Sequence, residues 1–159
     1  MIDKELLVKT VAEALEGTDM YIVEVAVSPA NEINVEIDSD SNVDIDTCAR
    51  ITRLIEGVFD RDAEDYELEV GSAGLTSPLK VLRQYTKNVG NDMEVLTRDG
   101  RKLRGVLAGA TAADGGDIAF DLEVQSREKE PGAKRPVTVT RRVPLTASEC
   151  KYVRYDLKF

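Results

Sequence analysis

The first half of the chain carries two stretches in which apolar residues recur at the period of an α-helix. The first stretch follows Asp3, which suits a helix N-cap, and stops before Gly17, which suits a helix end. Its apolar positions are Leu7, Val11, Ala14 and Leu15. The second begins at Asp44 or Asp46 and ends near Asp60, with apolar positions at Cys48, Ile51, Ile55, Val58 and Phe59. The spacing predicts two amphipathic helices.

Three shorter stretches of the same half alternate between apolar and other residues, which is the period of a β-strand. Residues 21–27 and 33–37 flank a turn at 28–31 and predict a hairpin with one acidic, solvated face. Residues 66–70 predict a third strand. Two helices on one face of a three-stranded sheet would bury both apolar stripes. We therefore expect an N-terminal α/β sandwich.

The second half changes character after one short helix, predicted from Pro78 to about Gln84. Five short strands are predicted at residues 93–97, 103–110, 118–124, 137–143 and 152–157. A polar loop at 125–135 separates two of them, and its charge and Pro131-Gly132 predict mobility. Such strands favour a small SH3-like or Sm-like β-barrel. We expect an α+β protein with an N-terminal α/β domain and linker at 1–83 and a C-terminal barrel domain at 84–159.

Charge divides the chain at the same place. The 159 residues carry a net charge of −9. Residues 1–83 hold 7 Lys/Arg and 19 Asp/Glu, a net charge of −12, whereas residues 84–159 hold 14 and 11, a net charge of +3. An acidic half repels nucleic acid and attracts basic protein, while a mildly basic half can approach RNA. The two halves are therefore expected to face different partners.

Composition removes most catalytic chemistry. The chain has no histidine, so the commonest general base and transition-metal ligand are missing. Cys48 and Cys150 lie too far apart in sequence for a zinc or redox motif, and no phosphate-binding loop or nucleophile motif is present. We expect no catalytic residue, no cofactor and no metal site. Because no signal peptide or membrane span is recognisable, we also expect a cytoplasmic protein.

Residues 38–46 place acidic side chains at the spacing of a calcium-binding loop. Val43 stands where that loop needs Gly, and Ala49 stands where it needs a bidentate Glu. A solvated turn that supplies a helix cap explains the acidic run better.

Gly71 and Gly74 match the GxxG that clamps a nucleic-acid backbone in KH domains. A KH loop joins two helices, whereas this one follows a strand whose Glu67 and Glu69 would repel phosphate. We interpret Gly71, Gly74 and Pro78 as the interdomain linker, in which the glycines permit positive φ and the proline adds stiffness.

Basic residues gather around the first hairpin turn of the second half and near its long loop. The candidates for contact with a partner are Arg98, Arg101, Lys102, Arg104, Arg141 and Arg142. Turns of a small barrel are common docking surfaces, and converging cations would bind phosphate with a steep salt dependence. Ordinary solvated strand ends explain the same residues equally well, because Asp99, Glu128 and Glu130 are interspersed among them.

Residues 34–38, 46–53 and 66–79 resemble, in order and spacing, the successive signatures of the RimP family of ribosome maturation factors. The resemblance continues to the closing strand and so covers essentially the whole chain. Its most specific part is the strand predicted at 66–70 and its exit, where the matching residues are Leu68, Glu69, Val70, Ser72, Gly74, Leu75, Pro78 and Leu79. Gly71, Ala73 and Ser77 depart from the family's Ser, Pro and Arg, so the exit is expected to be more flexible and to lack one positive charge.

The resemblance implies an α/β domain, an SH3-like barrel and a non-catalytic bacterial assembly factor. It further implies transient binding to the free 30S small ribosomal subunit, incorporation of small-subunit ribosomal protein twelve, and folding of 16S rRNA within the subunit. We expect the factor to act as a monomer. The alternatives are a general Sm-like RNA-binding module, which would bind naked RNA, and a hydrolase using acidic residues, against which the missing histidine counts.

Overall fold

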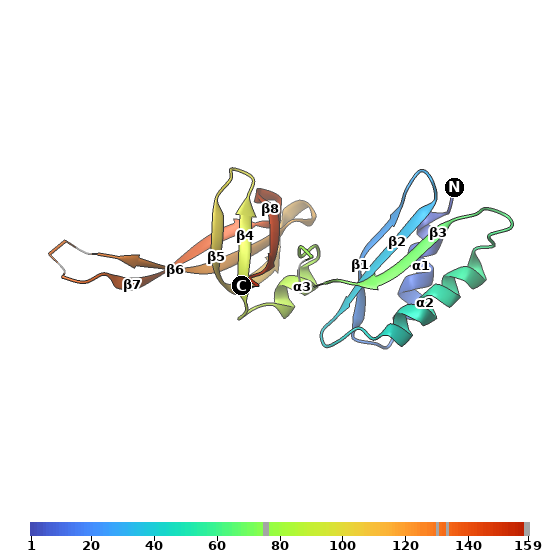
Figure 1. Ribbon diagram of the computed structural model, residues 1–159, viewed down its shortest axis with the longest axis horizontal. Helices are drawn as coiled ribbons and strands as arrows, with labels where there is room; N and C mark the ends of the chain where they lie inside the picture. Colours follow the sequence, from blue (N-terminus) through green and yellow to red (C-terminus); the bar gives the residue numbers. More distant parts are fainter. Residues whose placement is uncertain (75–76, 130, 133, 158–159) are drawn as a thin grey trace. The chain divides into compact units, whose positions relative to one another are not determined.

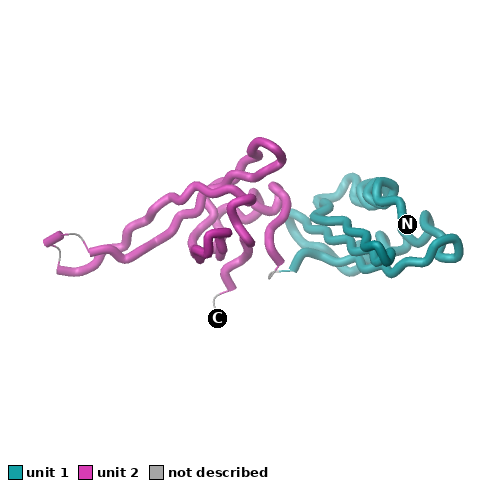
Figure 2. The backbone as a smooth tube through the Cα atoms, turned by 90° about the horizontal axis from the view of Figure 1, so that it is seen from above, with its two compact units in different colours: residues 1–74 teal, residues 75–159 magenta. Residues whose placement is uncertain are grey.

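The computed structural model describes residues 1–74, 77–129, 131–132 and 134–157. The chain separates into two compact units, Met1–Gly74 and Leu75–Phe159, which are coloured separately in Figure 2. Each unit has a hydrophobic core of its own. No helix in the described ranges is long and apolar enough to cross a membrane.

Unit 1 contains the two predicted helices and three predicted strands in the predicted order (Figure 1). Its elements are α1 (Lys4–Ala14), β1 (Met20–Val27), β2 (Glu32–Ser39), α2 (Ile45–Val58) and β3 (Glu67–Ser72). β1 pairs antiparallel with β2, and β2 pairs parallel with β3. Helix α2 is the crossover that a parallel pair of strands requires. Both helices contribute to one core with the inward side chains of the sheet, which confirms the predicted sandwich.

The helix starts follow the predicted caps. Asp3 Oδ1 accepts hydrogen bonds from the backbone N–H groups of Glu5 and Leu6 at 3.0 and 3.2 Å. Asp44, rather than Asp46, caps α2, because its Oδ1 accepts from the Thr47 N–H at 2.7 Å. Hydrogen bonding to the side chain and to the backbone N–H of Thr47 holds the pKa of Asp44 below its usual value. Each cap satisfies helix N–H groups that have no partner within the helix.

Unit 2 contains one short helix and a five-stranded antiparallel sheet (Figure 1). Its main elements are α3 (Leu82–Lys87), β4 (Asp92–Thr97), β5 (Lys102–Ala112), β6 (Ile118–Glu128), β7 (Val137–Thr146) and β8 (Cys150–Tyr155). The strand order is β7-β6-β5-β4-β8. Among the described residues no pairing joins the edge strands β7 and β8, so closure into a barrel stays a prediction.

The segment before α3 differs from the prediction. The helix begins at Leu82 and not at Pro78, because the chain before it is held outside the helix. Gln84 Oε1 accepts from the Lys80 and Val81 N–H groups at 2.7 and 3.2 Å. The Leu79 N–H donates to the carbonyl oxygen of Val153 in β8 at 2.7 Å. These contacts tie residues 79–82 to unit 2, whereas the sequence placed the domain boundary after Arg83.

Part of the predicted mobile loop at 125–135 is strand. Residues 125–128 continue β6 and pair with residues 137–140 of β7. The prediction was wrong for these four residues because strand pairing with β7 continues past the point where the apolar alternation of β6 ends. Positions 130 and 133 of that loop lie outside the described residues.

Candidate binding surface on the five-stranded unit

A buried carboxylate lies on the outward face of the five-stranded sheet. Met93 and Val95 of β4 point into the core, so Glu94 between them faces the opposite side. Glu94 pairs in register with Arg104 of β5 on one side and Arg154 of β8 on the other. Residues directly opposite one another in an antiparallel pair share a face. The register therefore brings Arg104, Glu94 and Arg154 side by side.

Three cations and one phenol surround the Glu94 carboxylate. Oε1 lies 3.2 Å from Lys102 Nζ and 3.4 Å from Arg154 Nη2, and Oε2 lies 3.8 Å from Arg104 Nη2. The Tyr152 hydroxyl donates to Oε1 at 2.7 Å. The guanidinium of Arg154 lies over the Tyr152 ring, 4.1 Å from its centroid. We call Glu94, Lys102, Arg104, Tyr152 and Arg154 the Glu94 cluster.

The burial of the cluster is unequal. The Glu94 side chain is 9% exposed, whereas the side chains of Lys102, Arg104 and Arg154 are 53%, 60% and 38% exposed. The Tyr152 hydrogen bond, together with Lys102 and Arg154, holds the pKa of Glu94 below its usual value. The same hydrogen bond raises the pKa of Tyr152. At neutral pH three positive charges therefore surround one negative charge, and the positive charges are the exposed ones.

This arrangement suits binding of a polyanion. Exposed Lys and Arg side chains held at fixed positions make charge-assisted hydrogen bonds to phosphate oxygens. Glu94 keeps the three cations close together, although their mutual repulsion would otherwise separate them. Among the described residues no group of three or more His, Cys, Asp or Glu side chains is placed to hold a metal ion.

Of the six predicted contact residues, only Lys102 and Arg104 share one site. Arg98 and Arg101 lie at the turn between β4 and β5, where each contacts a polar group of unit 2. Arg98 Nε donates to the carbonyl oxygen of Ser148 at 2.7 Å, and Arg101 Nε lies 3.2 Å from Asp99 Oδ2. The side chain of Arg98 is therefore directed at the segment before β8, and that of Arg101 at its own turn.

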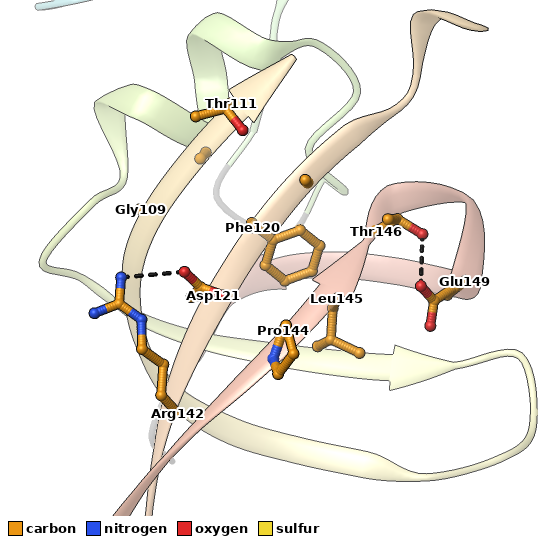
Figure 3. A pocket seen from close by; sticks show the side chains of 11 residues that line it. Gly109, Thr111, Phe120, Asp121, Arg142, Pro144, Leu145, Thr146 and Glu149 are labelled. Carbon is orange, nitrogen blue, oxygen red and sulfur yellow. Dashed lines mark hydrogen bonds and ion pairs between the residues drawn. The ribbon is translucent and has the colours of Figure 1, made fainter. Parts of the chain in front are cut away.

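Arg141 and Arg142 lie on opposite faces of β7 because successive strand residues alternate. Arg141 forms an ion pair with both carboxylate oxygens of Glu128 in β6, and its Nη2 lies 2.8 Å from Oε2 and 2.9 Å from Oε1. Arg142 Nη2 lies 3.1 Å from Asp121 Oδ2, at a surface cavity whose wall includes Phe120 and Leu145 (Figure 3). The strand predicted at 137–143 already implied opposite faces for these two residues, whereas their partners on β6 depend on the register, which the sequence does not give.

The linker candidates lie in different surroundings. Gly71 is inside β3, where it pairs with Glu36, and its φ is not positive. Gly74 is the last residue of unit 1, and Pro78 belongs to unit 2. Gly71 is therefore part of the sheet and not of the strand exit, contrary to the prediction.

Sequence reasoning missed three members of the cluster: Glu94, Tyr152 and Arg154. The alternation of β4 gave the outward direction of Glu94, and the alternation of β8 gave that of Tyr152 and Arg154. Their meeting depends on pairing between β4 and β8, which are more than fifty residues apart. No local signal predicts that pairing.

A small α/β unit followed by an antiparallel sheet with exposed cations defines a two-unit α+β protein. Comparisons with known proteins agree. Residues 10–76 match the family model of the RimP N-terminal domain. The chain is 42% identical over 151 residues to the ribosome maturation factor RimP of Porphyromonas gingivalis, covering 95% of this chain and 96% of the relative. It is 32% identical over 144 residues to the ribosome maturation factor RimP of Christiangramia forsetii, covering 91% and 90%.

The chain belongs to the RimP family. The family is one of bacterial ribosome maturation factors, so the chain is an assembly factor and not an enzyme.

Proposed function

We propose that the chain binds the free 30S small ribosomal subunit in the bacterial cytoplasm and assists its maturation. The observation that carries this proposal is the Glu94 cluster, an exposed excess of positive charge in a chain of the RimP family. Within the subunit, the cluster would contact phosphates of 16S rRNA and so favour a productive RNA conformation. Arg98, Arg101, Arg141 and Arg142 stay candidates for additional contacts, each at a separate position.

Unit 1 is proposed to face small-subunit ribosomal protein twelve and to assist its incorporation. Residues 1–74 hold 5 Lys/Arg and 19 Asp/Glu, a net charge of −14. Strands β1, β2 and β3 contain no Lys or Arg, and Glu32 lies opposite Glu67 in the pairing of β2 with β3. Such a surface attracts basic protein and repels RNA, which would orient the factor on the subunit.

We also propose a fold for unit 2, a role for the residues between the units, and an oligomeric state. The five strands of unit 2 are proposed to form an SH3-like fold, and Gly74 and Pro78 are proposed to set the geometry between the units. The factor is proposed to act as a monomer. Size-exclusion chromatography with light scattering tests the last point, because a measured mass equal to the 17.5 kDa of one chain would support a monomer and a multiple of it would contradict one.

The proposed function is tested by sedimentation of the purified, tagged chain with a bacterial lysate on a sucrose gradient. We expect selective co-migration with free small subunits. The variant K102Q/R104Q/R154Q removes three positive charges from the cluster and is expected to lose most of that co-migration. The matched control K4Q/K9Q/R50Q removes three exposed positive charges from unit 1 and is expected to keep it.

Three outcomes would contradict the proposal. Confinement of the chain to the light fractions, even at low salt, would exclude subunit binding. Equal loss in the cluster variant and the control would show that net charge, rather than the Glu94 cluster, governs association. Equal binding to small subunits and to protein-free RNA would favour the general RNA-binding module instead.

A further inference from the structure

Strands β6 and β7 continue beyond the rest of the sheet as a two-stranded arm (Figures 1 and 2). β5 pairs with β6 only as far as Glu123. From there, residues 125–128 pair with residues 137–140 of β7 and with no other strand among the described residues. We call residues 125–129 and 134–141 the β6–β7 arm. No third strand among the described residues pairs with the arm, and most side chains on its two faces are exposed.

The two faces of the arm differ in chemistry. Gln125 lies opposite Thr140, and Arg127 lies opposite Thr138, so these four side chains share one face. All four residues are exposed. They offer one cation, two hydroxyls and one amide, and no carboxylate. These are the side chains that contact phosphate and sugar in nucleic-acid complexes.

The opposite face is aliphatic and carries the one carboxylate of the paired strand residues. Val137 and Val139 lie on it beside Glu128 and Ser126. Glu128 is held there by Arg141 at 2.8 and 2.9 Å, and Ser126 donates to it at 3.3 Å. Its negative charge is therefore neutralised on the side away from Arg127.

The arm also concentrates the positive charge of unit 2. Residues 125–141 hold 5 Lys/Arg and 2 Asp/Glu, so their net charge is 5 − 2 = +3. Residues 75–159 hold 16 and 11, so their net charge is 16 − 11 = +5. More than half of the excess thus lies in one narrow element. Its end carries Lys129, Lys134 and Arg135, all exposed.

We propose that the Arg127 face and the basic end of the arm bind the sugar–phosphate backbone of structured RNA. The inference rests on the proposed function, because it assigns part of the RNA contact to an element separate from the Glu94 cluster. Protein is a poorer fit for the arm. Hot spots of protein interfaces are enriched in Trp and Tyr as well as Arg, and residues 125–141 contain no Phe, Tyr or Trp. Backbone contacts by a two-stranded ribbon would read shape and charge and not sequence.

The test compares two full-length variants that each remove four positive charges. The arm variant is R127Q/K129Q/K134Q/R135Q, and the control is K4Q/K9Q/R50Q/R53Q, whose four positions are exposed on unit 1. The probes are a fully paired RNA hairpin without protein and purified free small subunits. Binding is measured between about 50 and 200 mM salt, the range in which phosphate contacts weaken most visibly.

We expect the arm variant to bind the hairpin at least about tenfold more weakly than the wild type at the lowest salt, with a shallower salt dependence. The control is expected to stay within about twofold of the wild type, because its lost charges do not contact phosphate. Equal weakening of both variants would overturn the proposal. So would loss of subunit binding by V137S with none by the arm variant, which would assign the arm to a protein partner.

The failure of this inference and that of the proposed function are distinguishable. A wild type that binds small subunits but not the hairpin keeps the proposed function and overturns the arm as an RNA contact. A wild type that binds the hairpin through the arm but does not sediment with small subunits keeps the arm and overturns the proposed function.

Discussion

Tyr152 of β8 donates its hydroxyl hydrogen to Oε1 of Glu94 in β4 across 2.7 Å. The same ring lies under the Arg154 guanidinium, which itself lies 3.4 Å from Glu94 Oε1. The carboxylate, the phenol and the guanidinium therefore each contact the other two. Interactions of this kind are not additive, so removal of any member changes the geometry of the other two.

Substitution Y152F removes the hydroxyl and leaves the ring. We expect the free energy of unfolding to fall by about 1 kcal/mol, because hydrogen bonds to charged groups contribute more than neutral ones and this one is partly exposed. Y155F is the matched comparison, since the Tyr155 hydroxyl accepts a hydrogen bond at 3.1 Å from the neutral amide of Asn91. Urea unfolding should show the smaller loss for Y155F, and a reversed order would show that the charge on Glu94 adds nothing.

Acid should weaken the contribution of Glu94. Its pKa in the folded chain is held below the usual value of 4.5 by the Tyr152 hydrogen bond and by Lys102 and Arg154. The stabilisation is therefore fully present above that usual value and is lost as pH falls through the folded-state pKa. The difference in unfolding free energy between wild type and E94Q should shrink as urea denaturation is moved from neutral pH into this acid range. A difference that stays constant would contradict this assignment.

Gly105 is expected to be the least replaceable glycine of the sheet. A Cβ atom built on it would overlap the carbonyl oxygen of Glu123 in β6, and backbone cannot move aside cheaply. G105A should lower the unfolding free energy by about 1–3 kcal/mol, the usual cost of overpacking. G109A is the control in the same strand, because its nearest foreign atom would be Arg142 Nη2 at 3.8 Å. Thermal unfolding of the two variants compares them directly, and equal midpoints would refute the clash.

Local patterns predicted most of the fold because each element of unit 1 carries its own apolar period, and each helix carries its own N-cap. Asp3 and Asp44 stand where side-chain oxygens satisfy free helix N–H groups, and the apolar residues behind them repeat at helical spacing. The start of α3 was misplaced because Pro78 is locally suitable, whereas the hydrogen bond from Leu79 to Val153 is a long-range contact. Local sequence therefore determined the type of each element, whereas a long-range contact determined where α3 begins.

The candidate site was less predictable, since a strand sequence gives the face of a side chain but not its neighbours. Lys102 and Arg104 are two residues apart on β5, so the sequence already predicted that their side chains share a face. Glu94 was not linked to Arg154, because the pairing of β4 with β8 joins the two ends of unit 2. Arg141 and Arg142 were grouped by their closeness in sequence, although alternation along the predicted strand already places them on opposite faces. Charge clustering in sequence is thus a weak guide to clustering in a sheet.

The two cysteines are expected to react differently with alkylating reagents. Burial raises the pKa of the Cys150 thiol to about 11, and the residue is 5% exposed. Burial raises the pKa of Cys48 as well, but that residue is only partly buried. Since the thiolate is the reactive form, Cys48 should be modified first by iodoacetamide in the folded chain. Peptide mapping by mass spectrometry distinguishes the sites, and faster modification of Cys150 would contradict the burial described here.

E94Q also tests whether the Glu94 cluster is a binding surface or only stabilises the sheet. Glutamine keeps an oxygen that can accept from Tyr152 but removes the one negative charge among three exposed cations. If the cluster contacts phosphate, as proposed, E94Q should bind small subunits a few times more tightly, because the local positive charge increases. Its stability should nevertheless fall, since Lys102, Arg104 and Arg154 then repel one another without a counter-charge. Opposite signs for binding and stability are the expected result in sedimentation and urea unfolding. Lower stability with unchanged binding would instead mean that Glu94 and its cations hold the sheet together and that RNA is contacted elsewhere.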